Sequence, residues 1–380
     1  MNIKHILFFL ILCQISFAHS QTNNVNASVT IIDTADIVVL SVFPDSFPNV
    51  SVLFKAETRS NEPIWNLDKS KMQVKEDDED CDIISLEQVS KNKPINIGVV
   101  FDHSGSMQVS DSISKDTLAM MKLMYGLPYS LIFPDNYVPP IDNAKEAVNE
   151  FIESFNYSKD YISLIGFSSV VDARLPLSQD IENVKSVINS FKATRSTALY
   201  DAMIESIESV RDANGIKVLV VLTDGNDNSS SNTWYEVVKE ASKEEIPIFI
   251  IGLGDVNIDT LQAIADSTKG QFYYTEKSES LTSIYSDISK QVQAFYSLVY
   301  RSPNFASADS SRQIELLFEI DSLYLMPNST KMDLPVEVLT YIAKKERERS
   351  YNIKGSIAAV VVVSIGVLLL YFRRRENHKI

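Results

Sequence analysis

Residues 94–293 alternate short apolar segments with amphipathic ones, and this alternation limits the possible fold more than any other feature. The apolar segments have the length of strands and cover residues 96–102, 161–168, 217–224, 247–254 and 271–275. Helical periodicity occupies residues 142–155, 181–191, 198–213, 234–245, 257–267 and 278–294. The strand segments are largely apolar, which is typical of a parallel sheet covered on both faces. The pattern predicts a doubly wound, mostly parallel α/β domain of the Rossmann-like kind, with residues 171–177 as an edge strand.

Acidic residues close two of these strands. Asp102 ends the first strand, and Asp224 ends the third. Doubly wound sheets bind their ligands at the carboxyl ends of the strands, where the strand order reverses. We therefore expect Asp102 and Asp224 at the ligand-binding edge of the sheet.

The first strand runs into a turn that carries one acid and two hydroxyls, Asp102, Ser104 and Ser106. Alternate positions of an extended or tightly turning backbone face the same way. One carboxylate with two neutral oxygens suits a hard divalent cation, whereas nucleophilic catalysis would need a base beside a serine. His103 has no such partner nearby in sequence, and we expect it to be exposed. No catalytic residue is predicted.

Two further residues complete a pattern. Thr197 stands just before a helical segment, and Asp224 lies in a Thr-Asp-Gly sequence. Together with the turn, they resemble the metal-ion-dependent adhesion site of the von Willebrand factor type A (VWA) domain family. The resemblance implies a metal site made of Asp102, Ser104, Ser106, Thr197 and Asp224. In that family the hydroxyls bind the ion directly and the acids act largely through water.

The resemblance also implies a cofactor and a class of partner. The expected cofactor is a divalent cation, Mg²⁺ in the first place and Mn²⁺ or Ca²⁺ as alternatives. Neutral ligands leave its charge uncompensated, so the ion attracts an anionic ligand. A protein partner offering an Asp or Glu carboxylate would fit, without a small-molecule substrate or enzymatic activity. The alternative function is a membrane scaffold or assembly factor that cooperates with an ATPase in stress tolerance.

The chain departs from the family pattern in two places. Many relatives have glycines before the threonine, where this chain has Arg195 and Ser196, and Thr194 is an alternative to Thr197. An insertion between Met107 and Asp142 must emerge beside the metal turn. Its Met and aromatic side chains either pack on the domain itself or form a partner surface or lid.

Short β-branched runs flank the α/β domain at residues 24–91 and 296–341, with a last strand over residues 332–339. We expect the two flanks to pack as one β-sandwich into which the α/β domain is inserted. The acidic run 76–82 is interpreted as a solvated turn, and residues 343–352 as a charged stalk.

The two ends of the chain carry export and membrane signals. Residues 1–20 read as a signal peptide, with Lys4 and His5 before an apolar core and small residues at its end. Residues 355–372 are apolar and uncharged, and three arginines follow them, which predicts a transmembrane helix and a basic cytoplasmic tail over residues 373–380. The prediction is a single-pass cell-membrane protein whose N-terminal ectodomain lies outside the cytoplasm.

Charge and cysteine content exclude some classes of function. The net charge is −15, and the two predicted end segments hold more basic than acidic residues, so the ectodomain is more acidic still. This argues against a nucleic-acid partner. The chain has two cysteines, and Cys13 lies in the signal peptide. Cys81 is therefore expected to be a free thiol in a domain held together by its core.

Overall fold

The computed structural model describes residues 35–44, 46–58, 60–108, 138–194, 196–303, 311–320, 323–324, 328–334, 338–345 and 347–348. They all belong to one compact unit within residues 34–380. The predicted signal peptide, transmembrane helix and cytoplasmic tail, most of the insertion, and Arg195 lie outside the described residues. Among the residues that are described, no helix is long and apolar enough to cross a membrane.

A six-stranded sheet forms the centre of the α/β domain. Its strands are β6 (Ile95–Asp102), β7 (Tyr161–Phe167), β8 (Val171–Ser178), β9 (Ile216–Thr223), β10 (Ile248–Leu253) and β11 (Gln271–Thr275). The spatial order is β11-β10-β9-β6-β7-β8, parallel from β11 to β7, with β8 antiparallel at the edge. The chain winds outward from β6 through β7 and then returns to β9 on the other side of β6. The strand order therefore reverses between β6 and β9, whose ends carry Asp102 and Asp224.

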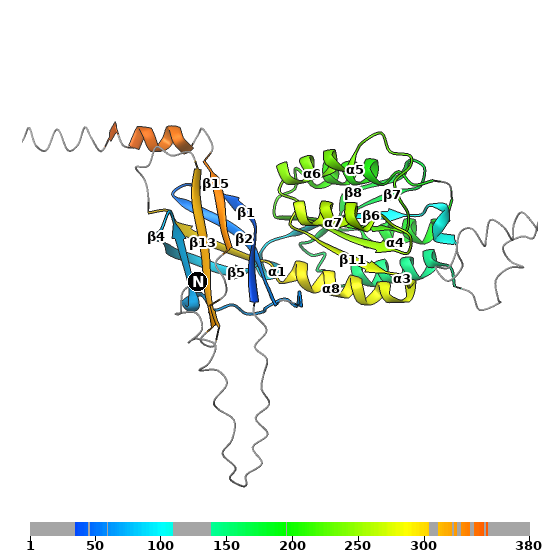
Figure 1. Ribbon diagram of the computed structural model, residues 1–380, viewed down its shortest axis with the longest axis horizontal. Helices are drawn as coiled ribbons and strands as arrows, with labels where there is room; N and C mark the ends of the chain where they lie inside the picture. Colours follow the sequence, from blue (N-terminus) through cyan, green and yellow to red (C-terminus); the bar gives the residue numbers. More distant parts are fainter. Residues whose placement is uncertain are drawn as a thin grey trace, which may run out of the picture. The chain divides into compact units, whose positions relative to one another are not determined.

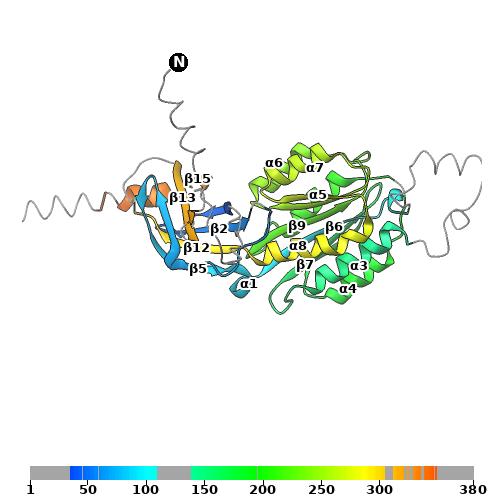
Figure 2. The ribbon, with the colours of Figure 1, turned by 60° about the horizontal axis from the view of Figure 1, so that its bottom comes forward.

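Helices cover both faces of this sheet (Figure 2). Residues of α3 (Pro140–Glu153), α4 (Ile181–Ser190) and α8 (Leu281–Gln293) share one apolar cluster with the sheet. Those of α5 (Leu199–Val210), α6 (Trp234–Lys243) and α7 (Ile258–Ser267) share another. All eight residues of β6 are buried, as expected for a strand covered from both sides. The prediction of a mostly parallel α/β domain is confirmed.

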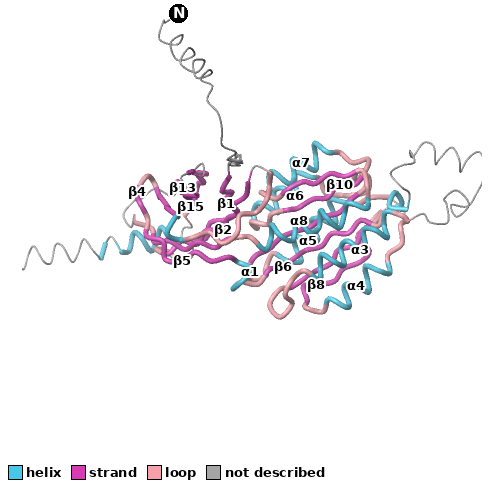
Figure 3. The backbone as a smooth tube through the Cα atoms, turned by 90° about the horizontal axis from the view of Figure 1, so that it is seen from below, coloured by secondary structure: helices cyan, strands magenta, loops and turns pink. Residues whose placement is uncertain are grey.

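The flanking segments form two antiparallel sheets. One has the order β1 (Ala35–Phe43), β2 (Asn49–Thr58), β12 (Tyr296–Arg301) and β5 (Asp82–Gln88). The other has β14 (Leu323–Tyr324), β13 (Ser311–Ile320), β3 (Met72–Glu76) and β4 (Glu79–Asp80), with β15 (Asn328–Asp333) also paired to β13. Each of these sheets contains strands from before and after the α/β domain (Figure 1), and Figure 3 shows how little helix accompanies them. The two sheets share one hydrophobic core.

The chain enters and leaves the α/β domain at neighbouring points. β5 continues through the short helix α1 (Val89–Asn92) into β6, and α8 is followed almost at once by β12. The Val89 amide donates to the Phe295 carbonyl at 2.7 Å. In the chain, β2 and β5 come before the inserted domain and β12 comes after it. Because β12 pairs with both β2 and β5, the two flanks meet in one sheet.

The prediction for the last strand of the flanks was wrong. The last strand does not continue to residue 339, because β15 ends at Asp333 and residues 338–345 are helical. Pro335 supplies the reason, since proline cannot donate to a strand ladder. Val338 and Ile342 of this helix are buried in the flanking core. The helix continues into residues 343–345, which are the first residues of the predicted stalk.

The acidic run 76–82 is not wholly solvated. Glu76 is fully buried and forms an ion pair with the equally buried Arg312 on β13. Its carboxylate also accepts hydrogen bonds from the Tyr300 and Ser302 hydroxyls, both at 2.7 Å. Only the residues after Glu76 make the tight turn, in which Asp77 and Asp78 have positive φ. The run therefore begins inside the core of the flanking sheets.

Candidate metal centre

Asp102 is the fixed point of the site. Its side chain is completely buried at the end of β6. One carboxylate oxygen, Oδ1, accepts a hydrogen bond from the Ser104 amide at 2.7 Å, and Oδ2 accepts one from the Thr223 hydroxyl at 2.7 Å. Burial raises the pKa of the Asp102 carboxyl, although these hydrogen bonds act to lower it. Asp102 thus shapes the turn and joins it to the end of β9.

The two serines of the turn converge on Asp224. Their hydroxyl oxygens are 3.1 Å apart. Ser106 Oγ donates to Asp224 Oδ1 at 2.6 Å, and Ser104 Oγ donates to the same oxygen at 3.3 Å. Since Asp224 comes directly after β9 and the serines follow β6, the reversal of strand order brings these residues together.

Thr197 faces the same place from a third segment. Its residue is 4% exposed, whereas the alternative, Thr194, is exposed and contacts the turn through its backbone amide. A Cβ atom added to Gly225 would lie 3.3 Å from Thr197 Oγ1 and 3.6 Å from Ser106 Oγ. Thr197 and Ser106 therefore flank the backbone of Gly225. All five predicted residues lie around one point at the carboxyl edge of the sheet.

The loop after β9 holds Thr197 in position. The Thr197 amide donates to Asn228 Oδ1 at 3.0 Å, and its carbonyl accepts from the Asn228 amide at 3.0 Å. Asp227 accepts from the first amide of α5, that of Leu199, at 2.9 Å. Asp201 in α5 accepts from the Ser231 and Asn232 amides. Asp201 and Asp227 therefore act as loop-organising residues, and Asn228 is a supporting residue that the sequence did not single out.

His103 is buried, so the prediction that it is exposed was wrong. It is 5% exposed, and its ring stacks on Phe191 with centroids 4.5 Å apart. Nε2 lies 2.8 Å from Asp172 Oδ1, and Nδ1 lies 3.3 Å from the Lys192 carbonyl oxygen. These partners lie about 70 and 90 positions away in the chain, so no local pattern indicates them. The imidazole ring therefore contacts both β8 and the segment that follows α4.

The oxygen atoms at this place define the chemistry that they can support. Three hydroxyls and two carboxylates are hard ligands of the kind that Mg²⁺, Mn²⁺ or Ca²⁺ takes. Over the described part of the chain, no group of three or more His, Cys, Asp or Glu side chains could hold a metal ion. The donor set therefore fits a site of mostly neutral oxygens and differs from the thiolate and imidazole sets of structural zinc.

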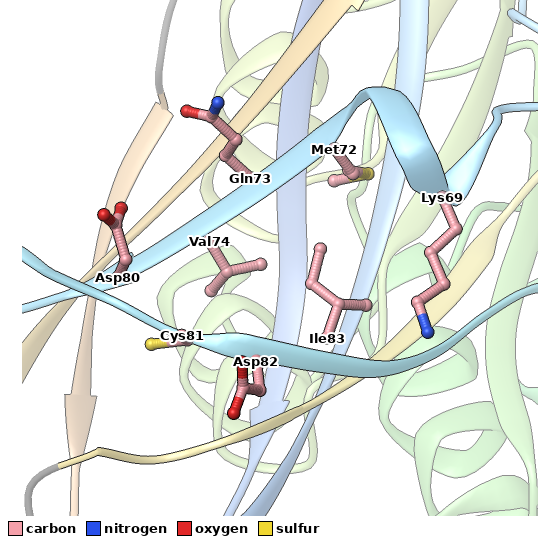
Figure 4. A pocket seen from close by; sticks show the side chains of 8 residues that line it. All are labelled: Lys69, Met72, Gln73, Val74, Asp80, Cys81, Asp82 and Ile83. Carbon is pink, nitrogen blue, oxygen red and sulfur yellow. The ribbon is translucent and has the colours of Figure 1, made fainter.

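A separate pocket of about 350 Å³ opens beside β3 and β5 (Figure 4). Cys81, Asp80, Asp82 and Lys69 are among the residues that line it. Burial, and secondarily the charge of Glu76, raises the pKa of the Cys81 thiol to about 12. A thiol with this pKa is protonated at neutral pH and is a poor nucleophile. The pocket therefore offers no support for cysteine catalysis.

Comparison with known proteins identifies the domain that carries the site. The model of the von Willebrand factor type A domain matches residues 138–287. This chain contains a VWA domain. The match includes Thr197 and Asp224 and begins at residue 138, near the end of the insertion. β6, which pairs with β7 and β9 in the same sheet, and the serine turn therefore precede the matched residues. VWA domains commonly bind a divalent cation and mediate protein–protein interaction. No curated protein sequence matches the chain.

Several solved structures resemble the chain at low sequence identity. BatB from Bacteroides thetaiotaomicron is 16% identical, with 52% of this chain and 99% of that one covered and a TM-score of 0.39. A von Willebrand factor type A protein from Catenulispora acidiphila is 11% identical over 80% and 74% of the two chains, with a TM-score of 0.42. Mussel proximal thread matrix protein 1, whose structure has a zinc-occupied MIDAS motif, is 19% identical over 57% and 49%, with a TM-score of 0.41.

Proposed function

We propose that this protein is a membrane-anchored, extracytoplasmic binding protein whose VWA domain captures a carboxylate of a protein partner through a divalent cation. Ser104, Ser106 and Thr197 would hold the ion directly, while Asp102 and Asp224 would act largely through water. The observation that carries the proposal is the convergence of both serine hydroxyls on Asp224 Oδ1, at 3.3 and 2.6 Å.

The electrostatics of Asp102 support a cation at this place. A fully buried carboxylate loses its hydration, and this loss disfavours its charged form. A divalent ion beside the serine hydroxyls would compensate that charge. Because the hydroxyls are neutral, the ion would keep enough net charge to attract an acidic ligand from outside. The arrangement is thus suited to binding rather than to turnover.

Calorimetric titration of Mg²⁺ and Mn²⁺ into the purified full-length protein tests the metal site. We expect one saturable site, which Asp224→Asn removes and which the matched variant Asp212→Asn retains. Asp212 is exposed at the far end of α5, away from the carboxyl edge. Absence of binding to the wild type, or equal binding to both variants, would contradict the proposed site.

The membrane anchor and the partner need separate tests. We propose that residues 355–372 anchor the protein and leave the VWA domain outside the cytoplasm, as their apolar length and following arginines favour. Protease added to intact cells should then degrade the domain. Affinity capture with this protein as bait, with and without EDTA, should recover a partner with an exposed Asp or Glu carboxylate only in the presence of the cation. Recovery of an ATPase complex instead would favour the scaffold alternative.

A further inference from the structure

We propose that His103 is a positioning residue that holds the Thr197 segment in register with the serine turn and so presets the metal site. The inference rests on the proposed metal binding, because its main consequence is a change in metal affinity. His103 itself would not touch the ion. Its side chain contacts Asp172 on β8, and Phe191 and Lys192 in the segment that leads to Thr197.

The backbone of His103 already links the turn to both neighbouring segments. Its amide donates to the Phe167 carbonyl at the end of β7, at 3.0 Å. Its carbonyl accepts from the Thr194 amide at 2.9 Å. The residue between two proposed metal-site residues, Asp102 and Ser104, is therefore also the attachment point of the loop that carries Thr197.

The imidazole strengthens this attachment on the same side. The ring stacks on Phe191 at an interplanar angle of 7°, and Nδ1 lies 3.3 Å from the carbonyl oxygen of Lys192. Phe191 and Lys192 come directly before the segment 193–197. A contact with the ring thus fixes the start of the threonine loop, while the contact of Thr194 with the His103 carbonyl fixes its middle.

The second ring nitrogen reaches the corner between β7 and β8. Nε2 donates to Asp172 Oδ1 at 2.8 Å, and the other oxygen of Asp172 accepts from the Ser168 hydroxyl at 3.1 Å. The Ser168 carbonyl in turn accepts from the amide of Ala198 at 2.7 Å. A continuous chain of hydrogen bonds therefore runs from His103 through Asp172 and Ser168 to the residue after Thr197.

These contacts hold the His103 ring from several sides. His103 and Ser168 are buried, and the ring has contacts at its face and at both nitrogens. Groups that orient metal ligands without touching the ion typically change metal affinity about 10- to 100-fold when they are substituted. Loss of the His103 ring should therefore weaken metal binding, because Thr197 would no longer be held at the spacing set by Ser104 and Ser106.

Substitutions at His103 and Asp172 test whether the imidazole contacts set the metal affinity. His103→Leu keeps an apolar side chain of moderate size but removes both nitrogen contacts, and we expect Mn²⁺ affinity to fall about 10- to 100-fold. His103→Gln can place an N–H near the position of Nε2 and donate to Asp172, so it should recover much of the affinity. Asp172→Ala, at a half-exposed position, removes the acceptor from the other side and should reproduce the loss.

A double-mutant cycle with Thr197→Ala tests the route of the effect. If His103 acts by positioning Thr197, then Thr197→Ala should lose much less affinity in the His103→Leu protein than in the wild type. Independent losses that multiply, or a His103→Leu protein with unchanged Mn²⁺ affinity, would overturn the inference.

Amide hydrogen exchange in EDTA distinguishes failure of this inference from failure of the proposed function. A wild type that binds no Mn²⁺ would refute the metal site, but the contacts by which His103 holds the Thr197 segment, here called the clamp, would still be testable. Faster exchange of the Thr194 and Ala198 amides in His103→Leu, but not in His103→Gln, would support the clamp. Unchanged exchange in His103→Leu would overturn it.

Discussion

The Thr223 hydroxyl donates to Asp102 Oδ2 at 2.7 Å and thereby joins the ends of β6 and β9. The other carboxylate oxygen accepts from the Ser104 amide, so both oxygens of Asp102 have a partner inside the protein. Direct coordination of an ion by Asp102 would have to share one of these oxygens with a hydrogen bond. The geometry is thus consistent with a carboxylate that fixes the turn and neutralises the ion from a short distance.

The pH dependence of stability should show the buried charge of Asp102. Burial raises the pKa of this carboxyl above 3.8 in the folded, metal-free protein. Its contribution to stability is therefore fully present at low pH and is lost as the pH rises through the folded pKa. Urea unfolding in EDTA should show Asp102→Asn gaining stability relative to the wild type as the pH increases. A difference that stays constant between pH 4 and 8 would contradict this expectation.

Gly225 should be needed for metal affinity more than for folding. A methyl group there would lie 3.3 Å from Thr197 Oγ1 and 3.6 Å from Ser106 Oγ. We expect Gly225→Ala to weaken Mg²⁺ binding by about tenfold, because the methyl group crowds the Thr197 hydroxyl, one of the proposed ligands. The free energy of unfolding should change by about 1 kcal/mol or less. Titration calorimetry and urea unfolding measure the two effects.

Gly252 provides the matched comparison, because it lies at the end of β10 in the same sheet. A Cβ atom there would lie 2.9 Å from Val256 and 3.0 Å from the ring of Phe272. Gly252→Ala should destabilise the protein by about 1–3 kcal/mol through overpacking and leave the Mg²⁺ affinity unchanged. Equal effects of both substitutions on metal binding would remove the argument for Gly225.

The α/β domain could be predicted from the sequence, because its strands and helices have strong and different periodicities. β6 and β9 are largely apolar because helices cover both faces of the sheet. Their acidic ends fall at the reversal of strand order, which is a consequence of the winding alone. The grouping of Asp102 with Asp224 could therefore be predicted from pattern.

What the sequence could not supply were contacts across long separations. His103 is buried by Asp172 and Phe191, and Glu76 by Arg312, 236 positions away. A single histidine or an acidic run gives no sign of such partners, and its default environment is solvent. The end of β15 is different, because Pro335 in the sequence was a usable signal.

Removal of one partner of the buried Glu76–Arg312 ion pair should strongly destabilise the flanking sheets. Both side chains are fully buried, so removal of one leaves an uncompensated charge. We expect Glu76→Ala to lower the free energy of unfolding by about 3–5 kcal/mol. Urea unfolding, followed by far-ultraviolet circular dichroism, measures the loss.

The surface pair Arg174–Glu205 provides the control. Its side chains are 55% and 30% exposed, and Glu205→Gln should cost about 1 kcal/mol or less. The double variant Glu76→Leu with Arg312→Met should be less destabilised than Glu76→Ala, because neither charge remains. A single variant at Glu76 as stable as Glu205→Gln would show that the buried pair is not required.

Cys81 should react slowly in the folded protein. Its pKa of about 12, compared with 9.0 for an unperturbed thiol, leaves little thiolate at pH 8. We expect alkylation by iodoacetamide to be about two orders of magnitude slower than in the urea-denatured protein. Peptide mass spectrometry can assign the modified cysteine. Equal rates in the two states would mean that burial does not protect the thiol.

Diffraction from crystals soaked in Mn²⁺ tests the central claim most directly. Anomalous scattering locates the ion without assuming any ligand. The account predicts one peak within coordination distance, about 2.0–2.2 Å, of Ser104 Oγ, Ser106 Oγ and Thr197 Oγ1, with Asp102 and Asp224 further out. A fully occupied peak elsewhere, or none at this edge of the sheet at saturating Mn²⁺, would contradict it.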